Sequence, residues 1–137
     1  MNSFLKRTAA VAVLAAAFGV ASAEDMSVKL TGAEEVPAVD SKATASGKIS
    51  VAKDMSVTGS IKTSGIAGTV AHIHQAEKGK NGPPIITLEK QGDDTFAVPA
   101  GSKLTDEQYA ALKAGNLYVN VHSAEHKPGE IRAQLKP

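Results

Sequence analysis

All four histidines of this chain fall in two short segments, residues 72–74 and 122–126. The first segment, His72-Ile73-His74, lies in a run of small and apolar residues that is typical of a β-strand. Because side chains alternate between the two faces of a strand, His72 and His74 share one face and Ile73 points to the other. Imidazole nitrogens suit zinc, copper and nickel, so this pair predicts one part of a transition-metal site.

The second histidine segment supplies the other candidate ligands. Alternation places the side chain of His122 on the face of its strand opposite to the neighbouring valines. If this strand lies beside the first one, three imidazoles converge on one patch, and His126 at the following turn is close enough to be a fourth. The candidate metal ligands are therefore His72, His74, His122 and His126.

Copper is the metal that this set of donors favours, with zinc as the second choice. The stability of complexes with nitrogen ligands is highest for Cu(II) among the divalent first-row metals, and an all-imidazole site suits copper at least as well as zinc. The alternative is that the histidines are simply solvated on the outer face of a strand, without any ion.

Other chemistry is poorly supported by the sequence. The chain has no cysteine, which removes disulfides, thiolate metal sites and cysteine nucleophiles. Glu34 and Glu35 are adjacent, so on an extended chain they point to opposite faces and do not flank one bond. Ser123 beside His122 lacks a nucleophile elbow and a plausible triad order. Hydrolysis is therefore not expected, and the question of enzymatic activity stays open.

The first 23 residues are typical of a cleavable secretory signal peptide. Lys6 and Arg7 precede an apolar run over residues 9–20, and Ala21-Ser22-Ala23 ends the segment as a signal-peptidase site does. The apolar run of about a dozen residues is shorter than the roughly 20 that a membrane-spanning helix needs. We therefore expect cleavage after Ala23, one domain over residues 24–137, a periplasmic or secreted product, and no membrane insertion after cleavage.

The charge and aromatic content of residues 24–137 argue against nucleic acid as a partner. Of the fifteen basic residues two lie before residue 24, while all fourteen acidic residues lie at or after it, so the domain is close to neutral. Its aromatic residues are limited to Phe96, Tyr109 and Tyr118. Neither a basic footprint nor a row of stacking platforms is present. The expected partners are a metal ion and, as a further option, another protein.

The elements that position the histidines follow from the spacing of alternating segments and turn residues, which predicts an all-β antiparallel sandwich or barrel of about eight strands. One short helix interrupts the series at residues 105–114, where Thr105 and Gln108 form a capping box and Gly115 suits the C-terminal cap. The expected strands are residues 26–31, 44–53, 55–62, 69–75, 84–90, 93–98, 117–122 and 130–135.

Four segments in this order resemble the CHRD domain, the module first named from chordin and also found singly in exported bacterial proteins. They are LTGAEEVPAV (30–39), AHIHQAEKGKNGPP (71–84), LKAGNLYVNVHS (112–123) and PGEIRAQL (128–135). The resemblance covers essentially the whole of residues 24–137, and it implies a Greek-key β-sandwich. It does not imply a particular activity.

The histidine segments are also similar, more loosely, to the copper site of Cu/Zn superoxide dismutases. This resemblance implies that His72, His74 and His122 are copper ligands and that Arg132 is the active-site arginine, whereas the zinc loop of that family has no counterpart here. Three functions follow as expectations. They are a copper-binding protein for storage, delivery or protection, a copper-only dismutase-like oxidoreductase, and a metal-free protein-interaction module.

Overall fold

The computed structural model describes residues 24–137, which form eight antiparallel strands, a 3₁₀ turn and one α-helix. The predicted signal peptide, residues 1–23, lies outside the described residues. Within residues 24–137, no helix has the length and apolar character that crossing a bilayer requires. The elements are β1 (Glu24–Thr31), η1 (Gly32–Glu34), β2 (Thr44–Val51), β3 (Val57–Ser64), β4 (Gly68–Gln75), β5 (Pro84–Gln91), β6 (Thr95–Ala97), α1 (Asp106–Lys113), β7 (Leu117–Ser123) and β8 (Ile131–Gln134).

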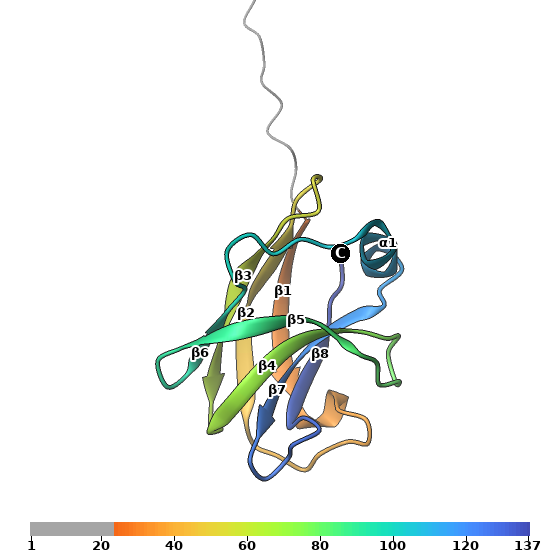
Figure 1. Ribbon diagram of the computed structural model, residues 1–137. Helices are drawn as coiled ribbons and strands as arrows, with labels where there is room; N and C mark the ends of the chain where they lie inside the picture. The colour runs from red at the N-terminus through yellow and green to blue at the C-terminus, as the bar shows by residue number, and fades with distance from the viewer. Residues whose placement is uncertain (1–23) are drawn as a thin grey trace, which may run out of the picture.

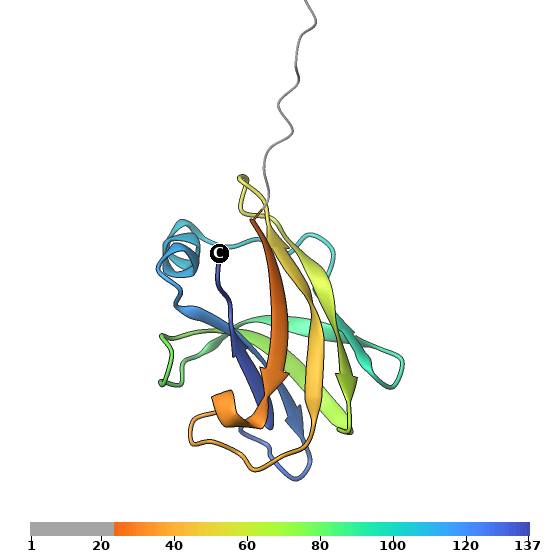
Figure 2. The same cartoon turned by 180° about the vertical axis from the view of Figure 1, so that it is seen from behind.

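The strands close into one antiparallel barrel in the order β1-β2-β3-β6-β5-β4-β7-β8. Strands β4, β5 and β6 are consecutive neighbours, and β7 returns to lie beside β4, which is a Greek-key arrangement. Figure 1 and Figure 2 show β1, β2 and β3 as one layer and β4, β7 and β8 as the other. The predicted all-β fold with eight antiparallel strands and one short helix is confirmed, and the two layers join into a closed sheet.

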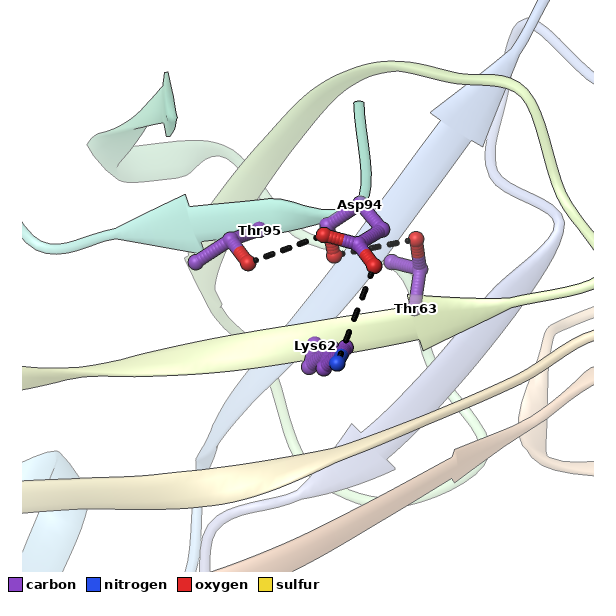
Figure 3. A network of polar contacts seen from close by, with 4 residues as sticks. All are labelled: Lys62, Thr63, Asp94 and Thr95. Atoms are coloured by element: carbon purple, nitrogen blue, oxygen red, sulfur yellow. Dashed lines mark hydrogen bonds and ion pairs between the residues drawn. The ribbon is translucent and has the colours of Figure 1, made fainter. Parts of the chain in front are cut away.

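Closure of the barrel depends on two narrow contacts. Strand β1 pairs with β8 only where Thr31 faces Arg132. On the other side the three-residue strand β6 bridges β3 and β5. Beside it, the backbone carbonyl of Asp94 accepts a hydrogen bond of 3.2 Å from the Thr63 hydroxyl, and the Asp94 carboxylate lies 3.9 Å from the Lys62 ammonium (Figure 3).

The core inside the barrel is built by alternation. On β1 the buried side chains are Met26, Val28 and Leu30, and the residues between them face outward. Strand β7 differs, because all seven of its residues are buried. Its Val119 and Val121 face the core, so the opposite face of β7 must be covered by something other than the barrel. That second buried face carries the candidate site.

Two local predictions can be compared directly with the structure. The helix begins after Thr105, whose hydroxyl accepts a hydrogen bond from the Gln108 amide, and the reciprocal half of the capping box is also present, as expected. Strand β3 begins two residues later than predicted. The reason is that Met55 takes a positive φ of 71° and belongs to the turn, where its amide donates to the Ala52 carbonyl.

Candidate metal centre

The pairing of β4 with β7 brings three of the predicted ligands together. His72 faces Asn120 and Val70 faces His122 in the register of the two strands, with a bulge between Gly68 and Val70. The imidazoles of His72, His74 and His122 thereby share the outer face of the sheet, as alternation predicts. Each offers one ring nitrogen, and these three nitrogens all lie within 4.8 Å of one another.

Backbone carbonyls determine which nitrogen of His74 and of His122 is free. Nδ1 of His74 lies 2.9 Å from the Gly82 carbonyl oxygen, and Nδ1 of His122 lies 2.7 Å from the Lys127 carbonyl oxygen. A carbonyl oxygen only accepts, so both Nδ1 atoms carry the proton and both Nε2 atoms of the neutral rings present a lone pair. A hydrogen bond from Nδ1 to a backbone carbonyl commonly orients a histidine that binds a metal through Nε2.

The Nε2 atom of His74 is buried and has no hydrogen-bond partner among the described residues. A buried acceptor left unpaired costs about 1–3 kcal/mol, so such an atom calls for an explanation. A cation at the point where the three nitrogens converge would use this lone pair. The donor set therefore fits a transition metal that prefers imidazole.

His72 is the most solvent-accessible of the three histidines. It is only half-buried, whereas His74 and His122 are buried. Its Nδ1 lies 3.0 Å from Nε2 of His122, so one proton joins these two nitrogens when no ion is bound. A metal ion at this position would take the place of that proton, which would move to Nε2 of His72 because a neutral imidazole keeps one N–H.

The environment of His72 and His74 favours their neutral form. Burial is the main cause that lowers the pKa of His72, and the neighbouring His122 and His74 lower it further. Burial likewise lowers the pKa of His74 below its ordinary value, although the Gly82 carbonyl acts in the opposite direction. Neutral imidazole is the form that binds a metal, so the site favours the binding-competent state at neutral pH.

The loop of residues 76–83 joins β4 to β5 (Figure 1), and its residue Gly82 lies against His74. Tyr118 stacks on His74 with ring centroids 4.7 Å apart and an interplanar angle of 1°. The Gly82 amide donates a hydrogen bond of 3.2 Å to the Tyr118 hydroxyl. Gly82 therefore holds both His74 and Tyr118, and its backbone fixes the position of the two rings.

Arg132 packs against the ring of Tyr118 and is buried. Its guanidinium carbon is 3.4 Å from the centre of the Tyr118 ring, and only 2% of the residue is exposed. The guanidinium donates to the Asn81 side chain and to the Glu77 carbonyl in the loop of residues 76–83. Glu130, two residues earlier, is bound by the hydroxyls of Ser41 and Ser123, so an exposed Glu130–Arg132 ion pair, as spacing alone would suggest, does not form.

His126 does not join the three other histidines in the structure. It lies in the loop between β7 and β8, where it groups with Glu125 and Glu130 at ligand-atom distances within 4.8 Å. The carboxylate of Glu130 is already bound by two serine hydroxyls. The histidine cluster on the sheet thus has three members, and His126 belongs to a separate group.

Two residues of the site were not predicted from the sequence. Asn120 is 2% exposed and lies between the histidines and Arg132 in the strand register, and Glu35 is 7% exposed. Burial raises the pKa of Glu35, while the charge of Arg132 and the side chain of Asn120 lower it. The available signal was the position of Asn120 on the same face as His122. For Glu35 no sequence signal existed, because its position depends on a loop.

Together these features define a closed antiparallel barrel with a three-histidine cluster on the outer, loop-covered face of β4 and β7. The sequence matches the family model of the CHRD domain over residues 26–135, so the chain belongs to the CHRD domain family. Searches among curated proteins and among solved structures found no match for this chain.

Proposed function

We propose that this chain is an exported copper-binding protein that holds one copper ion between His72, His74 and His122. One observation carries the proposal: three imidazole nitrogens converge, and Nε2 of His74 is buried among them without a partner. Copper is preferred to zinc because Cu(II) binds nitrogen donors most strongly among the divalent first-row metals. The predicted signal peptide supports export to the periplasm or the medium, where the ion would be stored, delivered or kept from harmful reactions.

The residues of this chain would each have a distinct part in holding the ion. Copper would bind tightly to three neutral imidazoles, and it can change oxidation state. Gly82 and Lys127 hold the protons of His74 and His122 on Nδ1, which leaves Nε2 free to bind. The partly exposed His72 is the side from which an ion would enter and leave.

The alternative of a copper-only dismutase has less support from the geometry. An arginine that attracts superoxide needs access to solvent, but Arg132 is 2% exposed and its guanidinium is stacked on Tyr118. A dismutase assay on the copper-loaded protein tests this alternative. Turnover well above that of free copper would favour the enzyme over the carrier.

Titration with Cu(II) followed by electron paramagnetic resonance tests the proposal. We expect one bound ion per chain with a nitrogen-rich signal, and we expect His74→Ala to lose it. His126→Ala is the matched control and should keep the signal, because His126 lies outside the cluster. Equally weak binding by wild type and His74→Ala would refute the copper site and favour a metal-free interaction module. Displacement of copper by equimolar zinc would identify zinc as the preferred ion.

A further inference from the structure

Asn120 lies at the centre of the polar face formed by β4, β7 and β8. In the strand register its neighbours are His72 on one side and Arg132 on the other. The side chain is 2% exposed, and its oxygen Oδ1 is buried with no hydrogen-bond partner among residues 24–137. A buried amide oxygen without a donor is as unusual as the unpaired nitrogen of His74, and both atoms belong to the same face of the sheet.

The amino end of the Asn120 side chain faces Glu35. A Cβ atom placed on Gly129 would lie 2.3 Å from Oε2 of Glu35 and 2.6 Å from Nδ2 of Asn120, so these two atoms flank the same point.

Two acceptors therefore face the same buried region. With its Nδ1 proton engaged by Gly82, His74 presents a lone pair on Nε2, and Asn120 presents the lone pairs of Oδ1. Neither atom can satisfy the other, because both lack a proton to donate. A cation bound between them would satisfy both at once, since carboxamide oxygens are also metal ligands.

We propose that Asn120 provides a fourth, oxygen donor to the ion held by His72, His74 and His122, and that Glu35 is a positioning residue that holds the amide in this orientation. This role of Asn120 rests on the proposed copper site, and it would make that site selective for one oxidation state of copper. An oxygen donor is harder than imidazole or thioether sulfur, so it favours Cu(II) over the softer Cu(I). The site would then bind the divalent ion selectively.

Pulsed electron–nuclear double resonance on Cu(II)-loaded protein with ¹³C at the asparagine Cγ tests the contact directly. We expect a ¹³C coupling to the copper electron in wild type and its loss in Asn120→Leu, a substitution close in volume. Asn116→Leu is the matched control, because Asn116 lies between α1 and β7 and is not part of the histidine cluster, so this variant should keep the coupling. Absence of the coupling in wild type that binds Cu(II) through its histidines would overturn the inference.

A second variant covers the case in which Asn120→Leu does not fold. The double variant Glu35→Gln and Asn120→Asp exchanges the amide and the carboxylate and so preserves the pair. It places a charged oxygen toward the ion, and we expect Cu(II) affinity at least tenfold above wild type with Cu(I) affinity changed much less. Both affinities are measured by competition with chelators.

The outcomes separate the two proposals. If the double variant binds Cu(II) within twofold of wild type while His74→Ala abolishes binding, Asn120 is not a donor and the three-histidine site stands. If wild type and His74→Ala bind equally weakly, there is no histidine site, and both proposals are refuted.

Discussion

Replacing Gly82 with alanine should disturb the histidine cluster without touching a ligand. A Cβ atom at this position would lie 1.8 Å from the Gln75 carbonyl oxygen and 2.7 Å from its carbon, well inside any real contact. Both partners are backbone, so no side chain can rotate away. The backbone at Gly82 must therefore move by roughly 1 Å or more, because the surrounding structure is close-packed.

A movement of this size breaks the contact that orients His74. The distance of 2.9 Å between its Nδ1 and the Gly82 carbonyl would exceed hydrogen-bond range, and the contact of the Gly82 amide with Tyr118 would be lost as well. Loss of such an orienting partner typically costs 10–100-fold in metal affinity, or about 1.4–2.7 kcal/mol. We expect Gly82→Ala to weaken Cu(II) binding by that factor and to lower the melting temperature.

Gly79→Ala is the matched control in the same loop. Gly79 has a φ of 83° and no atom within 4 Å of an added Cβ. Alanine there costs about 1 kcal/mol of stability through backbone strain, but it should leave copper affinity unchanged. Chelator competition and thermal unfolding are measured on both variants. Equal copper affinity in the two variants would show that the Gly82 carbonyl does not hold His74, and the reasoning would be refuted.

Four further predictions concern other parts of the structure. In copper titrations His122→Ala should lose the bound ion, whereas His126→Ala should retain it; loss in both would place His126 in the site. Because the pKa of His74 lies below the ordinary value of 6.5, the unfolded chain takes up more protons in acid, so the unfolding free energy of metal-free protein should be constant above that pH and decrease below it; urea unfolding between pH 8 and 5 measures this, and His74→Gln should reduce the slope. Arg132→Lys should destabilise the protein by about 2–3 kcal/mol, since lysine replaces neither the stacking on Tyr118 nor the fork of hydrogen bonds; an unchanged denaturation midpoint would contradict it. Thr105→Ala should cost about 1 kcal/mol by removing the helix cap, with a loss of about 4 °C in melting temperature and unaltered copper binding.

The part of the site that could be predicted is the part that strand geometry determines. A period of two places His72 and His74 on one face wherever the strand lies, and the same rule orients His122. The histidine pattern does not predict that these two strands pair, yet the imidazoles converge only if they do. The register between β4 and β7, including its bulge, meets that condition.

The remaining features depend on loops, which carry no periodicity. The face of β7 that holds Asn120 and His122 looks exposed in the sequence, yet it is buried because the chain outside the strands covers it. The position of Glu35, directly after η1, likewise depends on a segment without periodicity. Closure of the sheet could not be predicted either, because the pairing of β1 with β8 rests on a single residue pair that leaves no mark on the alternation of either strand.

The contact between His72 and His122 joins residues that are 50 positions apart in a chain without cysteine. An ion bound by both would act as a reversible cross-link between β4 and β7. In the chain-entropy model, a disulfide that closes a loop of this length lowers the entropy of the unfolded chain and so stabilises the folded state by about 4 kcal/mol. Metal binding would thus stabilise this domain in the way that a disulfide stabilises many exported domains, and a chelator would remove the stabilisation without any reductant.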